Sequence, residues 1–381
     1  MSSETSSSQH NNQNPNPETT NAFNIQSGRK LIIILLLPLI FGILIALLCN
    51  SETTNLFAFR RLFGSSTAAR SATGPLSASA SIAAVTSAAA LKGKTSSIEN
   101  QTSKMKTPIY FLSHGGPSVM YDQDHPAYRK LGQIGREITT KVKPRAVVVF
   151  SAHWQGGKDT IYVNTAETTD LIYDFYGFPD HYYKEKYPNV GSKDVSHRVL
   201  DLLKEAGIDA KGVKRGLDHG VWASFKCAFE PDDNPLNVPI VQVSLFDTED
   251  PAQHYRLGEA VSRLREENIL IIVSGMAVHN LRDMRFARGK PQPQPYTVSF
   301  DEALKEAVTT APEERENAMT VLLNRPDARQ AHPHFDHLLP IHVGAGAAGQ
   351  DLGKRLWTFP EGSMSWAQYR FGEVGNASSS L

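Results

Sequence analysis

Three histidines in this sequence each follow a short apolar run of the kind that forms a buried strand. They are His114 in FLSHGG, His153 in VVFSAHWQ and His279 in IIVSGMAVHN. In open α/β sheets, ligands bind beyond the carboxyl ends of the strands, where side chains from different strands converge. A lone histidine at a strand end is usually hydrogen-bonded or solvated, but three at equivalent positions favour a common site.

Neutral imidazole is a common metal ligand and suits zinc, iron, copper or nickel. Three protein ligands with open coordination positions are typical of a catalytic site, whereas a structural zinc site closes its shell, usually with cysteine. The chain has two cysteines, Cys49 and Cys227, which are far apart in the sequence. The sequence therefore predicts one divalent metal held by His114, His153 and His279 in a reactive site.

His219 stands in a different context, the segment GLDHGVW, which leads into the helical run WASFKCAF. It does not end an apolar strand, so we expect it to be an acid/base rather than a metal ligand. A histidine can both take and give a proton near neutral pH. The alternative for this residue alone is a histidine at a helix start that the neighbouring Asp218 stabilises.

The elements that must position these histidines can be read from the apolar pattern. Short apolar runs indicate buried strands at residues 108–113, 145–152, 238–245 and 269–274. Between them, helical patterns cover residues 131–142, 195–206 (with Gly207 as C-cap) and 250–267. This alternation predicts an α/β fold: a largely parallel central sheet with helices on both faces, forming a single catalytic domain over residues 106–375.

The first 105 residues differ in composition from the rest. Residues 1–30 are polar and are expected to be a disordered leader. Residues 31–49 carry no charge, and a bilayer span needs about 20 apolar residues, so we expect a single-pass N-terminal transmembrane helix; a cleaved signal peptide and a buried helix are the alternatives. Residues 50–105 are expected to be a flexible Ser/Ala-rich linker, although they also resemble an organelle transit sequence.

The charges bear on partners and on membrane orientation. Lysine plus arginine and aspartate plus glutamate are equal, at 39 each, so no nucleic-acid partner is expected. Arg29 and Lys30 lie closer to the apolar run than Arg60 and Arg61 do. Positive residues near a span set its orientation, which favours a catalytic domain across the membrane from a cytosolic leader.

Six ordered segments carry a resemblance to a known family. They are FLSHGGP, SAHW, YDFYGFP, LDHGVW, SGMAVHNL and HPHFDHLLPIHVGAGAAG. The resemblance that they carry covers residues 107–371. In these segments the sequence resembles the class III, LigB-type extradiol ring-cleavage dioxygenases, and within them the DOPA 4,5-dioxygenase-like subfamily. The resemblance does not reach the expected membrane anchor.

The resemblance implies a metal site of His114, His153 and His279 with His219 as the acid/base. Better-known class III relatives use two histidines and a glutamate, whereas this chain has His279 in the third place, as the DOPA-type subfamily does. Zinc fits three imidazoles well but has no redox chemistry. We therefore expect zinc as a bound ion or Fe(II) for turnover with dioxygen.

The implied activity is cleavage of a catechol, with DOPA a candidate for 4,5-cleavage, by dioxygen to a muconic semialdehyde. His332 and His337 could support the ligands or contact a substrate carboxylate, and Tyr173 belongs to a loop whose aromatic rings could stack on a substrate. Packing roles are the alternative for all three residues. Two other functions stay open for the chain: a zinc hydrolase or lyase on the same histidines, and a non-catalytic metal-binding protein.

Overall fold

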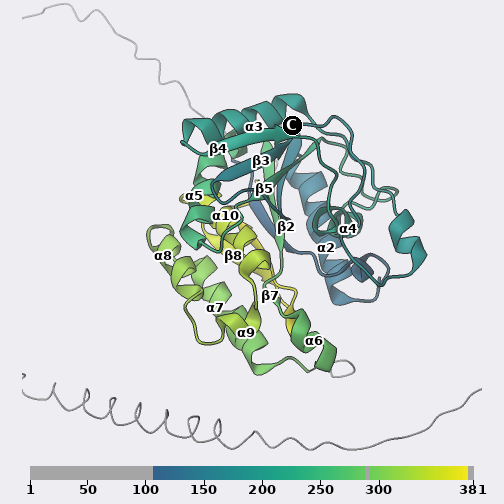
Figure 1. Ribbon diagram of the computed structural model, residues 1–381, viewed down its shortest axis with the longest axis vertical. Helices are drawn as coiled ribbons and strands as arrows, with labels where there is room; N and C mark the ends of the chain where they lie inside the picture. Colours follow the sequence, from purple (N-terminus) through teal and green to yellow (C-terminus); the bar gives the residue numbers. More distant parts are fainter. Residues whose placement is uncertain (1–105, 288–291, 376–381) are drawn as a thin grey trace, which may run out of the picture. The chain divides into compact units, whose positions relative to one another are not determined.

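The computed structural model describes residues 106–287 and 292–375. Its main sheet consists of β1 (Ile109–Ser113), β2 (Ala146–Gln155), β3 (Thr160–Asn164), β4 (Asp209–Val213), β5 (Ile240–Leu245), β6 (Ile269–Gly275), β8 (Gly353–Trp357) and β11 (Gln368–Phe371). The strands lie in the order β4-β3-β5-β2-β6-β1-β11-β8. Figure 1 labels β4, β3, β5 and β2 of this sheet side by side. The expected leader, apolar run and linker over residues 1–105 lie outside the described residues.

The centre of this sheet is parallel. β1 and β2 both pair with β6, and β2 also pairs with β5, all in parallel register. Antiparallel pairs flank the centre: β3 with β5 on one side, and β11 with β1 and β8 on the other. The expectation of a largely parallel α/β sheet is confirmed, and the antiparallel strands are an addition that the apolar pattern did not indicate.

Helices cover both faces of the sheet, as expected. On one face Val148 and Phe150 of β2 belong to a core with α3 (Lys193–Glu205), α5 (Pro251–Val261) and α10 (Leu339–Ala347). On the other face Val147 and Val149 pack with α2 (Pro126–Glu137) and α4 (His219–Ala228) (Figure 1). Because side chains alternate along a strand, β2 contributes to both cores.

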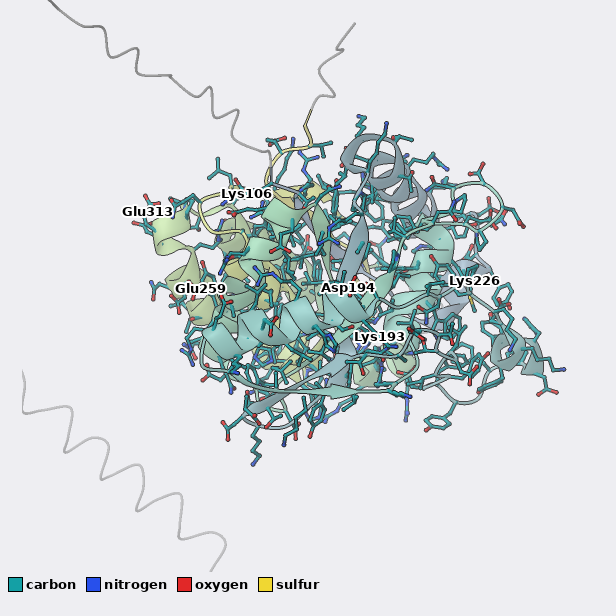
Figure 2. All side chains as sticks on the ribbon, turned by 90° about the horizontal axis from the view of Figure 1, so that it is seen from above. Lys106, Lys193, Asp194, Lys226, Glu259 and Glu313 are labelled. Carbon is teal, nitrogen blue, oxygen red and sulfur yellow. The ribbon has the colours of Figure 1, made fainter. Side chains whose placement is uncertain are left out.

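The outer faces of the helices are polar. Figure 2 shows Lys193 and Asp194 at the start of α3, Glu259 on α5, and Glu313 on α8 (Pro312–Leu322) among the charged side chains at the surface. The helix expected over residues 195–206 is confirmed as α3, and Gly207 beyond it has a φ of +73°, a left-handed conformation that glycine adopts at helix ends.

A second, three-stranded sheet positions His279. Its strands are β7 (Val278–His279), β10 (Met364–Ser365) and β9 (Pro360–Glu361), with β10 in the middle. The sequence had indicated that His279 ends the strand that became β6. In the structure it lies in β7 instead. The chain turns after Gly275, where the Met276 backbone N–H donates to the His337 carbonyl, and pairs with the C-terminal strands before it reaches His279.

The remaining described elements are α6 (Leu281–Ala287), α7 (Pro295–Thr309), α9 (Ala328–Ala331) and the short 3-10 or π turns η1 (Pro117–Met120), η2 (Ile138–Val142), η3 (Asp180–Lys184), η4 (Ser262–Glu267) and η5 (Phe335–His337). The helix expected over residues 131–142 consists of α2 and the wider π-helical η2 that continues it. The helix expected over residues 250–267 consists of α5 and the tighter 3-10 helix η4.

The membrane prediction is corrected here. Across residues 106–287 and 292–375, no helix has both the length and the hydropathy needed to cross a bilayer. The longest of these helices, α7, has 15 residues, against about 20 that a span requires. By this finding the expectation of a single-pass membrane protein, with its assigned side of the membrane, is wrong. Residues 31–49, on which the expectation rested, lie outside the described residues.

Candidate active site

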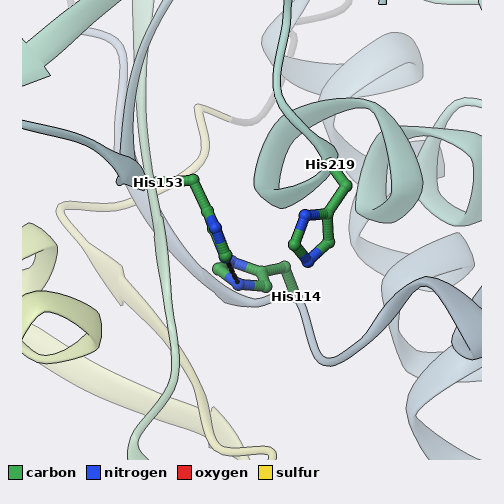
Figure 3. Close-up of side chains that lie close together, drawn as sticks. All are labelled: His114, His153 and His219. Carbon is green, nitrogen blue, oxygen red and sulfur yellow. Dashed lines mark hydrogen bonds between the residues drawn. The ribbon is translucent and has the colours of Figure 1, made fainter. Parts of the chain in front are cut away.

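His114 and His153 face each other at the carboxyl ends of β1 and β2, two central strands on either side of β6. His114 follows β1 directly and is buried, and His153 lies in the last residues of β2, beyond the point where β2 pairs with β6. Their Nε2 atoms are 3.3 Å apart (Figure 3). One ring nitrogen each from His114, His153 and His219 lie within 4.8 Å of one another. The convergence expected from the strand ends is thus present for two of the three predicted ligands.

A buried serine fixes the tautomer of His114. The His114 Nδ1 lies 2.9 Å from Ser274 Oγ, and this hydroxyl donates its own hydrogen to the carbonyl of Gly220. Because the hydroxyl hydrogen is already used, the hydrogen between the two side chains belongs to His114 Nδ1. The Nε2 of His114 therefore carries a free lone pair.

Asp174 holds the other two histidines. Its Oδ2 is 2.9 Å from His153 Nδ1, and its Oδ1 is 2.8 Å from His219 Nδ1. The Oδ1 atom also accepts from the backbone N–H of His219 at 3.1 Å. A carboxylate only accepts hydrogen bonds, so each ring carries a hydrogen on Nδ1 and, in its neutral form, presents a bare Nε2.

His279 belongs to a neighbouring group with Asp336 and His337. The rings of His279 and His337 are stacked, with centroids 3.6 Å apart. His337 connects the two groups, because its Nε2 lies 3.2 Å from the Nε2 of His153. The structure thus places the three predicted ligands and His219 in one cluster, but it brings His337, and not His279, into direct contact with His153.

Burial keeps most of this cluster neutral. Removal from water, reinforced by the neighbouring histidines, lowers the pKa of His114, His279 and His337 well below the ordinary value. Burial acts in the same direction on His153, but the hydrogen bond to Asp174 and the charge of Asp218 outweigh it and raise the pKa of His153. Hydrogen bonds from His153 and His219 overcome burial at Asp174 and lower the pKa of its carboxyl.

These features fit a bound metal ion. The bare Nε2 lone pairs of His114 and His153 face each other at 3.3 Å, so a proton or a cation must lie between them. Two nitrogen ligands at about 2.1 Å from one tetrahedral ion are roughly 3.4 Å apart. Metal ligation also requires neutral imidazole. Burial lowers the pKa of His114 and His279 and so favours this form, whereas at His153, whose pKa is raised, a bound cation would have to replace a proton on Nε2. The donor set can therefore hold one divalent cation.

Comparisons with known proteins agree with this chemistry. Residues 108–372 match the family model described as the catalytic LigB subunit of aromatic ring-opening dioxygenase. A "4,5-DOPA dioxygenase extradiol" of Beta vulgaris is 35% identical over 270 residues, which are 69% of this chain and 95% of the relative. A protein of the same name from Escherichia coli is 32% identical over 247 residues, 64% of this chain and 86% of the relative.

The chain belongs to the LigB family of aromatic ring-opening dioxygenases. The crystal structure of an uncharacterized protein from Escherichia coli K12 matches it with a TM-score of 0.57 and 29% identity, covering 70% of this chain and 100% of that chain. As a LigB-family extradiol dioxygenase, the enzyme opens a catechol-type ring with dioxygen at a single metal ion. The zinc hydrolase and the non-catalytic binding protein, which the sequence had left open, do not agree with this assignment.

In this LigB-family enzyme Asp218 does not hold the ring of His219, which was the alternative that the sequence left open. The Asp218 carboxylate is fully buried and accepts from Ser151 Oγ at 2.7 Å and from Arg215 at 3.0 Å. The guanidinium of Arg215 also donates to the carbonyl of His153 at 3.3 Å. Asp218 therefore supports the backbone around His153, while the ring of His219 is held by Asp174.

The further candidate residues of the dioxygenase lie in three different settings. His332 is buried, and its Nε2 is 3.0 Å from the carbonyl of Ala277, one residue before β7. His337 lies inside the histidine cluster, as described above. Tyr173 precedes Asp174, donates its hydroxyl to the carbonyl of Glu185 at 2.7 Å, and packs edge-on against Trp222.

The sequence reasoning missed Ser274, and it placed Asp174 in a loop over the pocket without giving it a role in holding a histidine. Both lie inside segments that carry the family resemblance, YDFYGFP and SGMAVHNL, so the position of Asp174 was visible in the sequence. Its task was not visible, because it depends on a loop after β3 that brings residue 174 between His153 and His219.

A cavity of about 340 Å³ opens beside the cluster, with Gln155, His334 and Asp336 in its lining.

Proposed function

We propose that this LigB-family enzyme cleaves DOPA, or a catechol with a similar amino-acid side chain, at the 4,5 bond. Relatives from Beta vulgaris and Escherichia coli that carry the name 4,5-DOPA dioxygenase extradiol support this choice of substrate. So does a third, from Schizosaccharomyces pombe, named as a 4,5-DOPA dioxygenase extradiol-like protein and 34% identical over 86% of its length. The product would be a muconic semialdehyde that can cyclise through its own amino group.

We further propose that His114, His153 and His279 bind the metal. The observation that carries this assignment is the pair of bare Nε2 atoms of His114 and His153 at 3.3 Å, each ring being fixed by a hydrogen bond at its Nδ1. Burial that keeps His279 neutral supports its place as the third ligand. Fe(II) is the proposed metal for turnover, since zinc fits such a site but has no redox chemistry.

When bound, the metal supplies Lewis acidity and a template that holds the diol and dioxygen together. The chain supplies the proton transfers. His219 has its Nδ1–H donated to Asp174, so its bare Nε2 can accept the second phenolic proton of the catechol and later return it to an oxygen of the opening product. Phe175 packs edge-on against the ring of His219 with centroids 5.5 Å apart and keeps that ring from turning.

The test is reconstitution with Fe(II) under anaerobic conditions, followed by exposure to dioxygen and a panel of catechols. We expect stoichiometric dioxygen uptake and a yellow product with DOPA, and product mass and NMR spectra that place the cleavage at the 4,5 bond. Cleavage of simple catechols with no turnover of DOPA would reject the substrate assignment. Equal turnover with Zn(II) would reject the assignment of the metal.

A further inference from the structure

Asp174 is in contact with two histidines to which we assign different tasks. One carboxylate oxygen accepts from His153 Nδ1 at 2.9 Å, and the other accepts from His219 Nδ1 at 2.8 Å and from the His219 backbone at 3.1 Å. The two rings lie with their centroids 4.1 Å apart. No other carboxylate among the described residues is recorded in hydrogen-bonding contact with both rings.

We propose that Asp174 is a positioning residue that sets the tautomer and orientation of His153 and His219 together, and so fixes the proton acceptor relative to the metal. The inference rests on the proposed function, in which His153 is a ligand and His219 an acid/base. A ring that donates from Nδ1 to a carboxylate keeps the lone pair on Nε2. With both rings donating to the same carboxylate, both bare Nε2 atoms are directed by one side chain.

The loop that carries Asp174 is fixed on both sides of it. Phe175 is buried and packs against His219 and Trp222. Tyr173 is hydrogen-bonded to the backbone of Glu185, whose carboxylate is in turn paired with Lys226 of α4, the helix that begins at His219. The position of Asp174 is thus set by the same helix that carries the acid/base.

An asparagine at this position separates a positioning role from a role in folding. The amide keeps the size of the side chain and one acceptor oxygen, but its nitrogen is a donor and would face one of the two Nδ1–H groups. That ring would then prefer its hydrogen on Nε2, which blocks metal ligation at His153 or proton acceptance at His219. Groups that orient metal-bound histidines typically contribute 10–100-fold to metal affinity or activity.

The experiment compares Asp174→Asn with Asp170→Asn, a matched change at an exposed aspartate in the same loop. His153→Ala and His219→Ala report on the proposed function itself. Zn(II) affinity is measured by competition with a chelator, and kcat and KM for DOPA are measured at saturating Fe(II). For Asp174→Asn we expect Zn(II) affinity or kcat, or both, to fall about 10–100-fold, with KM changed little, whereas Asp170→Asn should behave as wild type.

Two double variants assign the loss. At saturating Fe(II), Asp174→Asn added to His219→Ala should cause no further loss of kcat, because the group through which it acts on turnover is already absent. His153→Ala should not retain metal through purification, and adding Asp174→Asn to it should leave unchanged the weak Zn(II) affinity that the chelator competition measures. A further tenfold loss in both backgrounds would overturn the inference.

Other results separate failure of the inference from failure of the proposed function. Retained metal in His153→Ala, or full turnover in His219→Ala, would reject the proposed function. If those two variants behave as expected and Asp174→Asn only lowers Tm, with affinity and kcat equal to those of Asp170→Asn, the positioning role is rejected. Should Asp174→Asn not fold, Asp174→Glu keeps both acceptor oxygens but displaces them by one methylene. We then expect a folded enzyme with reduced kcat, and wild-type kcat with wild-type affinity would reject the role.

Discussion

The imidazole of His279 lies stacked on that of His337, with ring centroids 3.6 Å apart and ring planes inclined by 15°. The Nε2 of His337 is in turn 3.2 Å from the Nε2 of His153. Two neutral imidazoles therefore lie within reach of the proposed third ligand position, and the stacking fixes both ring planes. Our assignment gives the metal to His279 and makes His337 the residue that packs against it.

Removal of each imidazole distinguishes these tasks. His279→Ala should lose the metal, as should His114→Ala and His153→Ala, because each removes one of three protein ligands. His337→Ala should retain the metal with affinity lowered about 10–100-fold, since it removes only a support for a ligand. Metal content of the purified variants checks this, with His197→Ala on the surface of α3 as the control. Full metal in His279→Ala and none in His337→Ala would exchange the two assignments.

The acid/base role of His219 predicts a different pattern. His219→Ala should keep its metal and lose turnover by about 10²–10⁴-fold, because it removes the imidazole that we propose as acceptor of the phenolic proton. Parallel measurement of metal content and of kcat gives the comparison. A variant that loses its metal together with its activity would show that His219 is a ligand.

The two glycines after His114 should respond very differently to an added methyl group. Gly115 has a φ of +63°, and a Cβ there would lie 1.9 Å from the ring of Trp366, whereas a Cβ on Gly116 would meet only Ser118 Oγ at 4.0 Å. Gly115→Ala should lower the free energy of unfolding by at least about 1–3 kcal/mol through overpacking and backbone strain. Gly116→Ala should change it by less than about 0.5 kcal/mol. Urea denaturation of both variants is the measurement, and equal stability would contradict the close packing of Trp366.

Buried histidines outside the cluster make the free energy of unfolding depend on pH. Burial lowers the pKa of His342, whose Nε2 is 3.1 Å from the Met319 carbonyl, to about 4. Between that value and about 6.5, the ordinary pKa of histidine, the unfolded chain binds a proton that the native chain does not. Stability conferred by neutral His342 is therefore complete above this window and is lost as pH falls through it, at up to about 1.4 kcal/mol per pH unit.

His342→Gln should remove this part of the slope when unfolding of the metal-free protein is followed by urea titration from pH 7 to pH 4. His197→Gln, the same change at an exposed side chain on the surface of α3, is the control and should leave the slope unchanged. An unchanged slope in His342→Gln would show that His342 becomes protonated in the native protein.

Where a segment is apolar on its own, the sequence was enough to predict it. The runs at residues 108–113 and 269–274 became β1 and β6 almost without change, because strands buried on both faces are recognisable without knowledge of their partners. Helix α10 was not predicted, although its residues are all buried. It has no polar face and so shows no helical period, and Gly346 permits it to approach α5 so closely that a Cβ would lie 1.9 Å from the Tyr255 carbonyl.

The part of the site that lies on such apolar strands was predictable from the sequence, and the rest was not. His114 and His153 follow recognisable strands, so their convergence could be inferred. His279 was placed at the wrong strand, because β7 exists only through pairing with β10, and Met364 opposite His279 is far away in the sequence. Asp174 lies in an irregular loop, and neither period nor propensity indicates where such a loop directs a carboxylate.

The pairing of β11 with β1 has a consequence for the order of events during biosynthesis. β1, which leads directly into His114, lies between β6 and β11, and its Phe111 is opposite Tyr369. Synthesis delivers β1 early and β11 some 250 residues later, and non-local pairings of this kind are slow to form. Until residues 368–371 leave the ribosome, one edge of the strand beside the metal site has no partner, and Gly115 lacks the Trp366 ring that packs on it. The central sheet around β1 is therefore completed only by the last strand to be synthesised, and its open edge is exposed to wrong pairing until then.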